Sequence, residues 1–295
     1  MVCSVKSYLE LTKAGIVLFV LLSGMAGYAL SFPIGSPFYF LHFIHFILGL
    51  YFLSSGSFVL NQAQEWRRDL VMARTKERPI PSGKLDPRLA ILLGIFYVAV
   101  GAGLLFLQSP LSSCLGLGTV VLYNGFYTLL WKRKWAFGAV PGAIPGAMPV
   151  VIGYAVHSPQ VLTPACIYLF LIMFLWQMPH FWCLAIRYKE DYRAGGFPVL
   201  ASSHGVQATL YHIGLYVFVY IGVALVSPWF LRTHILYVLL VVPIALKVLW
   251  EFFNFYRHQA KGTWLRFFLW VNFSLLVFVG VPVADRWVGL VLTAP

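Results

Sequence analysis

Long apolar segments alternate with short polar connections along the whole chain. Nine of the segments are about 20 residues long, the length at which an α-helix crosses the hydrocarbon layer of a bilayer. Their approximate limits are 14–32, 39–60, 89–107, 113–131, 138–156, 163–184, 208–227, 234–252 and 265–282. Apolar residues follow one another without alternating with polar ones, so the segments predict helices and not the strands of a membrane barrel. We therefore expect an all-α membrane protein in which residues 1–295 form one transmembrane domain.

The composition agrees with this picture and excludes other classes of protein. Hydrophobic residues make up 60% of the chain and charged residues 10%, whereas a soluble domain carries about 25% charged residues. So little charge cannot cover a surface that faces water, which excludes a soluble globular protein and a disordered chain. The four cysteines are scattered and form no C-x-x-C pair. A structural zinc site or a disulfide framework is therefore not expected.

The net charge of +12 reports how the chain is oriented in the membrane. All but two of the 21 lysines and arginines lie before the first apolar segment, or in or beside the connections that follow even-numbered segments; the exceptions are Arg232 and Arg286. Positive residues accumulate on the cytoplasmic side of membrane proteins. We therefore expect the N-terminus and these connections in the cytoplasm, or in the mitochondrial matrix. A nucleic-acid partner is not expected.

The carboxylates are concentrated more strongly than topology requires. Six of the nine lie in only two connections, 61–88 and 185–207. Acidic residues contribute little to the orientation of a membrane protein, so their position on the basic side needs another reason. The pattern indicates that a polar site is assembled at one face of the membrane.

The first of these connections predicts a magnesium site. Asn61, Glu65 and Asp69 are four residues apart, so a helix that continues from the second apolar segment places all three on one face. Mg²⁺ binds one or two carboxylates and leaves its other positions for water and phosphate oxygens. The same connection carries basic residues that can bind phosphate: Arg68, Arg74, Lys76 and Arg78. The alternative is a solvated basic loop in which the acids form only surface ion pairs.

The second connection predicts a matching acidic cluster. Glu190 and Asp191 lie just past the sixth apolar segment, beside Lys189. The two acidic clusters are four helices apart, which is typical of membrane proteins built from two similar halves around one cavity. Each cluster could hold one Mg²⁺, so that a diphosphate is bound between them. The alternative is an interfacial loop whose long side chains extend to the membrane surface.

Four blocks of the chain resemble the UbiA superfamily of intramembrane prenyltransferases, and within it the branch that acts on haem. The first is YLELTKAG at 8–15, and the second is the N-x-x-x-D-x-x-x-D-x-x-M-x-R-T-x-x-R-P segment at 61–79. The third contains Tyr127-Thr128, Lys132-Arg133 and the glycine- and proline-rich run at 139–153, and the fourth contains WQMPH at 176–180 and Asp191 to Gly195. The chain departs from the family's usual residues at Ala14 instead of proline, Glu65 instead of aspartate, and Gly195 instead of the second aspartate of quinone-directed relatives.

The resemblance implies a bundle of nine transmembrane helices around a central cavity with a cytoplasmic cap. The implied reaction transfers the farnesyl group of farnesyl diphosphate to a vinyl group of haem b, with addition of water, and yields haem O and diphosphate. Mg²⁺ is the implied cofactor, and haem b is a substrate. Other implied partners are the lipid bilayer and a downstream haem-modifying enzyme or terminal oxidase assembly. The implied location is the bacterial inner membrane or the mitochondrial inner membrane.

The site residues follow from the matching blocks. The expected catalytic residues are Asn61, Glu65, Asp69 and Asp191, and the expected metal ligands are Asn61, Glu65, Asp69, Glu190 and Asp191. The expected substrate-binding residues are Arg68, Arg74, Arg78, Lys132, Arg133, Lys189 and His180. Polar groups within membrane helices usually serve function, and His180 could ligate haem iron, orient a water molecule or bond a neighbouring helix. The run at 139–153 is expected to serve helix packing.

Two other functions remain open at this stage. One is a UbiA enzyme that acts on an aromatic quinone precursor, which the WQMPH block and the missing second D-x-x-x-D motif disfavour. The other is a polytopic haem transporter without catalysis. A transporter predicts charged groups along a path at the middle of the bilayer, whereas nearly every carboxylate here lies at one face.

Overall fold

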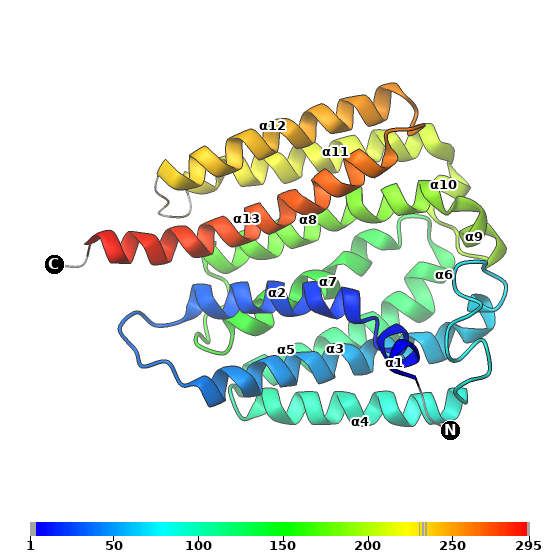
Figure 1. Cartoon of the computed structure of the whole chain (residues 1–295), viewed down its shortest axis with the longest axis horizontal. Helices are drawn as coiled ribbons and strands as arrows, with labels where there is room; N and C mark the ends of the chain where they lie inside the picture. The colour runs from blue at the N-terminus through cyan, green and yellow to red at the C-terminus, as the bar shows by residue number, and fades with distance from the viewer. Residues whose placement is uncertain (1–3, 230, 232, 234, 294–295) are drawn as a thin grey trace. The chain divides into compact units, whose positions relative to one another are not determined.

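The computed structural model describes residues 4–229, 231, 233 and 235–293, so Arg232 lies outside the described residues. Within that part of the chain every regular element is a helix (Figure 1), which confirms the predicted fold class. The elements are α1 (Val5–Leu11), α2 (Ala14–Ser31), α3 (Phe40–Asp69), α4 (Pro87–Phe106), α5 (Pro110–Val120), the π-helix η1 (Val121–Trp131), α6 (Lys132–Lys134), α7 (Ala139–Tyr154), α8 (Pro164–Arg187), α9 (Lys189–Ala194), α10 (Leu200–Ser203), α11 (Gly205–Val226), the 3₁₀-helix η2 (Ser227–Trp229), α12 (Ile235–Arg257) and α13 (Trp264–Thr293).

Eight stretches of helix among the described residues are long and apolar enough to cross a membrane. The remaining predicted span is the fifth, 138–156, which corresponds to α7, an apolar helix of only 16 residues. The fourth span combines α5, η1 and α6 in one run, Pro110–Lys134. The second span is longer than predicted, since α3 continues beyond residue 60 to Asp69. This extension confirms that Asn61, Glu65 and Asp69 lie on one helix.

Several helices begin where the sequence offers a cap followed by proline. The side-chain oxygens of Asp86, Ser109 and Thr163 accept backbone N–H groups of the first turns of α4, α5 and α8. Proline occupies the first helical position after each of them, where its missing N–H costs nothing. These caps satisfy donors that a bilayer would leave without partners.

The chain divides into two compact units. The first contains residues 1–159 and 190–199, and the second contains residues 160–189 and 200–295. In the first unit α3 packs along α4 and α2 packs along α7; in the second, α8 packs against α11 and α13, and α12 packs against α11 and α13.

Small residues allow α2 and α7 to approach closely in the first unit. A Cβ atom added to Gly27 would lie 2.0 Å from the backbone oxygen of Val150, and one added to Gly153 would lie 2.0 Å from that of Gly24. Only glycine permits such contact between backbones. The structure therefore confirms that the glycine-rich run at 139–153 serves helix packing.

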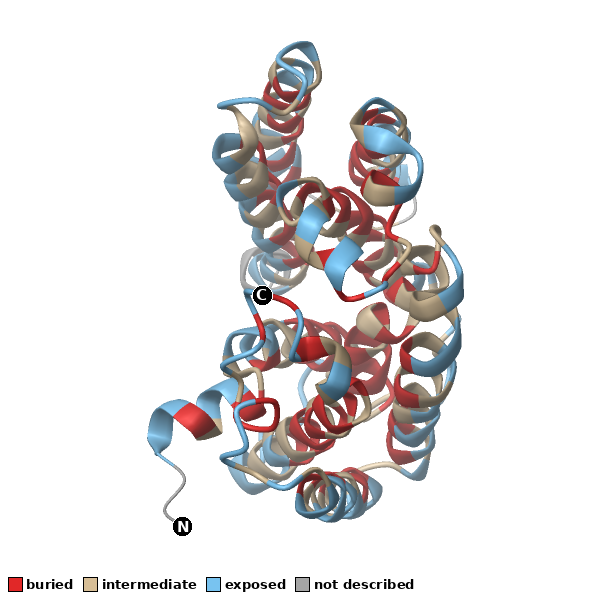
Figure 2. Ribbon diagram, turned by 90° about the vertical axis from the view of Figure 1, so that its right-hand side faces the viewer, coloured by how far each residue is buried: buried red, intermediate tan, exposed pale blue. Residues whose placement is uncertain are grey.

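Large apolar side chains cover the outward faces of the helices. On α4, Leu89, Leu92, Ile95 and Phe96 are all more than half exposed, whereas Ala90 on the opposite face is fully buried. Within each unit, buried positions lie where helices pack together and exposed positions face outward (Figure 2). Exposed apolar faces of this extent are stable in lipid and not in water, so the chain is an integral membrane protein that crosses the bilayer several times.

Candidate active site on the first unit

The inner face of α3 carries the predicted metal ligands. The side chains of Asn61, Glu65 and Asp69 are almost completely buried, with 1%, 3% and 1% of each residue exposed. The basic residues Arg67 and Arg68 occupy the last turn of the helix, where they interact favourably with its dipole. The structure thus holds three oxygen-bearing side chains in one row, as their spacing predicted.

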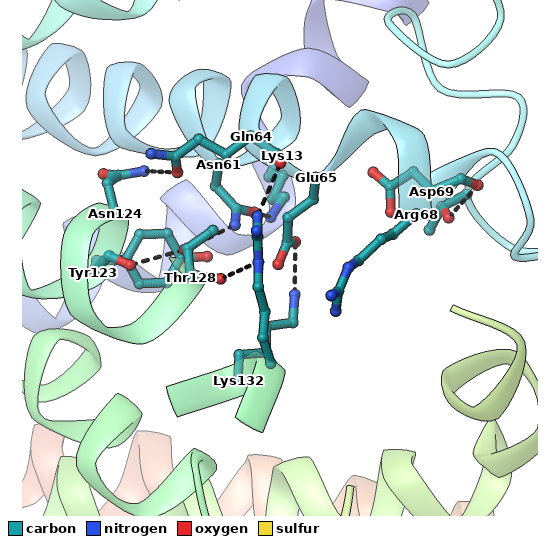
Figure 3. A network of polar contacts seen from close by, with 12 residues as sticks. Lys13, Asn61, Gln64, Glu65, Arg68, Asp69, Tyr123, Asn124, Thr128 and Lys132 are labelled. Atoms are coloured by element: carbon teal, nitrogen blue, oxygen red, sulfur yellow. Dashed lines mark hydrogen bonds and ion pairs between the residues drawn. The ribbon is translucent and has the colours of Figure 1, made fainter. Parts of the chain in front are cut away.

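Three hydrogen bonds, here called rungs, join α3 to the fourth span. The side-chain pairs are Ser57 with Asn124 at 2.7 Å, Asn61 with Thr128 at 3.1 Å, and Glu65 with Lys132 at 2.7 Å. Figure 3 shows the residues of the second and third rungs. The partners are 67 residues apart in every rung. A constant separation means that α3 and the fourth span run in the same direction and keep one register over two turns.

The fourth span contributes to the rungs from a π-helical segment. Thr128 donates its hydroxyl hydrogen to the backbone oxygen of Tyr123, five residues earlier, at 2.8 Å. Such segments cost stability and occur frequently at functional sites. Asn124 and Thr128 were not predicted as site residues. A signal for them exists, because polar residues recur every four positions within this otherwise apolar segment.

Lys13 is a further member of the site, and it was expected only as a cytoplasmic charge and as part of the block at 8–15. Its ammonium donates to Oδ1 of Asn61 at 2.7 Å. Its backbone is left-handed, with φ at 52°, which costs about 1–2 kcal/mol for a residue with a Cβ atom. Burial, together with the nearby charges of Arg78 and Lys132, lowers the pKa of Lys13 from 10.5 to about 7.

The turn-rich connection after α3 folds back onto Asp69. The Arg78 guanidinium donates from Nη1 to Oδ2 of Asp69 at 2.8 Å, and the Thr75 hydroxyl donates to the backbone oxygen of Asp69 at 3.0 Å. Met72 and Ile80 from the same connection are buried. The connection therefore packs against the end of α3 through these side chains, whereas Arg74, Lys76 and Glu77 are exposed.

The Glu65 carboxylate is only half satisfied by the protein. Its Oε2 atom accepts from Lys132, whereas Oε1 is buried and has no hydrogen-bond partner. An unpaired buried carboxylate oxygen is costly and is a natural ligand for a hard cation. The described residues contain no group of three or more His, Cys, Asp or Glu side chains that could hold a metal. Carboxylate and amide oxygens are the kind of ligand that Mg²⁺ takes, and Mg²⁺ leaves its other positions for water and phosphate oxygens.

Positive charge exceeds negative charge around this row. Lys132 and Arg68 lie over the same ring, that of Phe197, at 4.6 and 4.9 Å from its centroid. Arg133 donates to the backbone oxygens of Thr128 and Gln64 at 3.0 and 3.1 Å, and so ties the fourth span to α3. The surplus of cations suits an anionic substrate with more than one negative charge.

The segment that carries the second acidic cluster also contacts this region. The Glu190 carboxylate is 65% exposed and pairs with Arg193 at 3.0 Å, and Asp191 is half-buried. The contacts with the first connection come from Tyr192, which lies under Arg74 with 5.8 Å to its centroid, and from Gly196, whose oxygen accepts from Arg68 at 3.4 Å. Metal binding by Glu190 and Asp191 stays a prediction.

The packing of Gly195 explains one departure from the quinone-directed relatives. A Cβ atom at Gly195 would lie 2.8 Å from Sδ of Met72, so a carboxylate at this position would displace a buried side chain. Phe197, like Tyr192, was not predicted as part of the site. Of the remaining predicted residues, Lys189 and His180 belong to the second unit.

Comparison with known proteins agrees with this arrangement. The model of the UbiA prenyltransferase family matches residues 18–273. A protoheme IX farnesyltransferase from Bdellovibrio bacteriovorus is 53% identical over 95% of this chain and 96% of its own length. Similar folds occur in a solved digeranylgeranylglyceryl phosphate synthase, with a TM-score of 0.74 over 95% of this chain and 98% of the other at 18% identity. A similar fold also occurs in a UbiA homologue from Archaeoglobus fulgidus bound to DMAPP and Mg²⁺. Its TM-score is 0.69 over 94% of this chain and 99% of the other, at 15% identity.

The matching region covers both units, from α2 to α13. It includes the whole row on α3, the π-helical segment and the residues that flank them. The chain belongs to the UbiA prenyltransferase family.

Proposed function

We propose that the protein transfers the farnesyl group of farnesyl diphosphate to a vinyl group of haem b and so produces haem O. The bond between C1 of the farnesyl chain and the diphosphate oxygen breaks, and its electron pair leaves with diphosphate. The outer vinyl carbon of the haem forms the new C–C bond to C1. Water then adds to the inner vinyl carbon and releases a proton, which leaves a hydroxyethylfarnesyl side chain.

The choice of donor and acceptor is supported by the 53% identity to a protoheme IX farnesyltransferase over nearly the full length of both chains. The observation that carries the chemistry is the buried row on α3 with the unpaired Oε1 atom of Glu65. A row of oxygens surrounded by surplus cations is what ionisation of an allylic diphosphate needs, because negative charge develops on the leaving group.

Each group of residues has a role in this proposal. Asn61, Glu65 and Asp69 would hold Mg²⁺, which when bound neutralises charge on the diphosphate. Arg68 and Lys132 bind the diphosphate oxygens, and Phe197 beneath them offers a ring face that favours cations. Roles for Arg74, Arg78, Arg133, Lys189, Glu190 and Asp191 in binding substrate or metal are part of the same proposal. Water must be kept from the allylic cation until the C–C bond has formed.

The same proposal includes the setting of the enzyme. We expect the N-terminus and the α3 row on the cytoplasmic side of the inner membrane, because positive residues accumulate in the connections on that side. Both substrates are amphipathic, so both can reach the site from the bilayer. The product remains membrane-bound, and a haem-modifying enzyme or the assembly of a terminal oxidase would consume it.

The test is to incubate the purified protein with haem b, farnesyl diphosphate and Mg²⁺, and to measure the porphyrin by mass spectrometry and the diphosphate released. A mass gain of one farnesyl group plus one hydroxyl group, lost when Mg²⁺ is chelated, is the expected result. Parallel reactions with an aromatic quinone precursor test the other acceptor class. Diphosphate release with that precursor and not with haem would overturn the proposed acceptor, and no release with either would favour a non-catalytic protein.

A further inference from the structure

A second polar cluster lies in the second unit, where α8 packs against α13. At its centre the His180 ring lies beside the ring of Trp176, at 4.6 Å between centroids, and beside that of Phe268, at 5.0 Å. Trp176 is itself fixed, because its Nε1–H donates to the backbone oxygen of Val271 at 3.1 Å. The aromatic neighbours from two helices therefore hold the imidazole in one plane.

Asn272 decides which nitrogen of His180 carries the hydrogen. The Nδ2 group of Asn272 donates to the backbone oxygen of Phe268 at 2.6 Å. A carbonyl oxygen only accepts, so the reversed amide would set two oxygens against each other. The Oδ1 atom of Asn272 therefore faces Nδ1 of His180, at 3.0 Å. Because that oxygen also only accepts, Nδ1 carries the hydrogen, and Nε2 of the neutral ring carries the lone pair.

The Nε2 atom of His180 is available to a ligand. It makes no hydrogen bond within the described part of the chain. His180 is half-buried, and Nε2 is not one of the fully buried polar atoms that lack a partner. An imidazole held by an acceptor at one nitrogen and open at the other is the arrangement found in metal-ligating histidines, where the second nitrogen sets tautomer and orientation.

The ligand that fits is an iron porphyrin and not a bare metal ion. A zinc ion needs three or four protein ligands, and the described residues contain no group of three His, Cys, Asp or Glu side chains suited to a metal. A porphyrin supplies four nitrogens to its iron, so the protein needs to add only one axial ligand. The aromatic side chains of Trp176 and Phe268 provide apolar surroundings for such a macrocycle.

We propose that Nε2 of His180 is the axial ligand of the iron of the haem acceptor, and that Asn272 is the positioning residue that keeps this nitrogen unprotonated. The inference rests on the proposed function, because that function supplies the haem. One bond from the iron to a rigid imidazole fixes the height and tilt of the macrocycle relative to α8. A macrocycle held at one height and tilt in every turnover has fewer positions open to its vinyl groups, which is part of the positional control that a selective transfer requires.

The test is a titration of the purified full-length protein, in lipid nanodiscs, with ferric haem b, followed by absorption and electron paramagnetic resonance spectra. Wild type should bind one haem with an imidazole-ligated signature. His180→Gly should lose that signature, bind haem at least about 10-fold more weakly, and regain the signature when free imidazole is added. His212→Ala is the matched control, because His212 is a half-buried histidine of the same unit whose Nδ1 bonds the backbone oxygen of Ala208 at 2.7 Å.

Variants at Asn272 test the inference without removing the imidazole. Asn272→Leu removes the acceptor and should weaken haem binding about 10- to 100-fold while raising the reduction potential of the bound iron. Asn272→Asp is a stronger acceptor, so it should lower that potential. A residue that served only packing would not move the potential in opposite directions.

Several outcomes overturn the inference. They are a wild-type haem complex without imidazole ligation, a His180→Gly spectrum equal to that of wild type, and an unchanged potential in both Asn272 variants. Its failure is distinguishable from failure of the proposed function. Haem bound through His180 without farnesyl transfer contradicts only the reaction, whereas farnesyl transfer with unchanged spectra in His180→Gly contradicts only the axial ligand.

Discussion

The two polar clusters solve the problem of burying polar groups in opposite ways. On α3, the carboxylates of Glu65 and Asp69 are buried with ammonium and guanidinium groups at 2.7 and 2.8 Å. Around His180 the groups are neutral, and one amide satisfies the imidazole. Removing one partner from a buried ion pair leaves an uncompensated charge and lowers the free energy of unfolding strongly. Removing one partner from the neutral pair lowers it less. The first arrangement suits a highly charged ligand, and the second suits a single coordinate bond.

The comparison predicts that the largest loss of activity follows from removing a charge on α3. Asp69→Ala should lower the rate of diphosphate release about 100- to 1,000-fold, because a proposed ligand for the metal is lost and Arg78 loses its partner. The rate is measured with saturating farnesyl diphosphate and haem. Glu77→Ala is the control, since Glu77 is an exposed acid of the same connection, and its rate should equal that of wild type.

A loss of the haem spectrum in Asp69→Ala would break the distinction between the two clusters. The ferric haem signature should be unchanged in this variant, because Asp69 belongs to the charged cluster alone. Equal rates of release in Asp69→Ala and wild type would refute the role given to the row on α3.

The next largest effect should be a changed requirement for metal. Glu65→Gln keeps the shape of the side chain but removes its charge, so the Mg²⁺ concentration for half-maximal rate should rise on the order of 10- to 100-fold. Titration of Mg²⁺ at fixed substrate concentrations measures this. An unchanged midpoint would show that the unpaired Oε1 atom of Glu65 does not contact the metal.

A smaller effect is expected from the cation that pairs with Glu65. Lys132→Met retains the apolar stem but removes one charge beside the diphosphate, so KM for farnesyl diphosphate should rise about 10-fold with a smaller change in kcat. Lys134→Met is the control, because Lys134 is exposed at the end of the same span. Equal KM values for both variants would contradict diphosphate binding by Lys132.

The smallest effect concerns packing between the two acidic connections. Gly195→Asp should lower the free energy of unfolding by about 1–3 kcal/mol, since its Cβ atom would lie 2.8 Å from Sδ of Met72. The double variant Gly195→Asp/Met72→Ala should lose about 1 kcal/mol less free energy of unfolding than the sum of the losses in the two single variants. Thermal unfolding in detergent measures all three variants. Strict additivity would mean that this contact does not decide which residue occupies position 195.

The sequence predicts those features that depend on residues close together in the chain. The step of four from Asn61 to Asp69 placed these side chains on one helical face, and α3 confirms it. Long apolar segments likewise predicted the membrane helices, with α7 shorter than expected. The π-helical segment was not anticipated, because its form depends on partners outside the segment, such as Asn61 opposite Thr128.

Contacts between residues far apart in the sequence were not predicted. The offset of 67 residues between α3 and the fourth span depends on the length of the intervening connection and helix and on how they pack. The bond from Lys13 to Asn61 depends on a left-handed residue at the start of α2. The Phe197 ring meets Arg68 and Lys132, which lie more than 60 residues before it in the chain, so no local pattern reveals it.

The amino-acid sequence by itself determined the membrane setting, the helices and the row of oxygen-bearing side chains on α3, because hydrophobicity and helical periodicity act over a few turns. Only the tertiary structure decided which cation faces each carboxylate, and which nitrogen of His180 stays open. The open nitrogen depends on Asn272, which lies 92 residues away in the chain. Hydrogen bonds between distant segments exist only after the helices have packed, since their direction and length are set by the positions of both backbones.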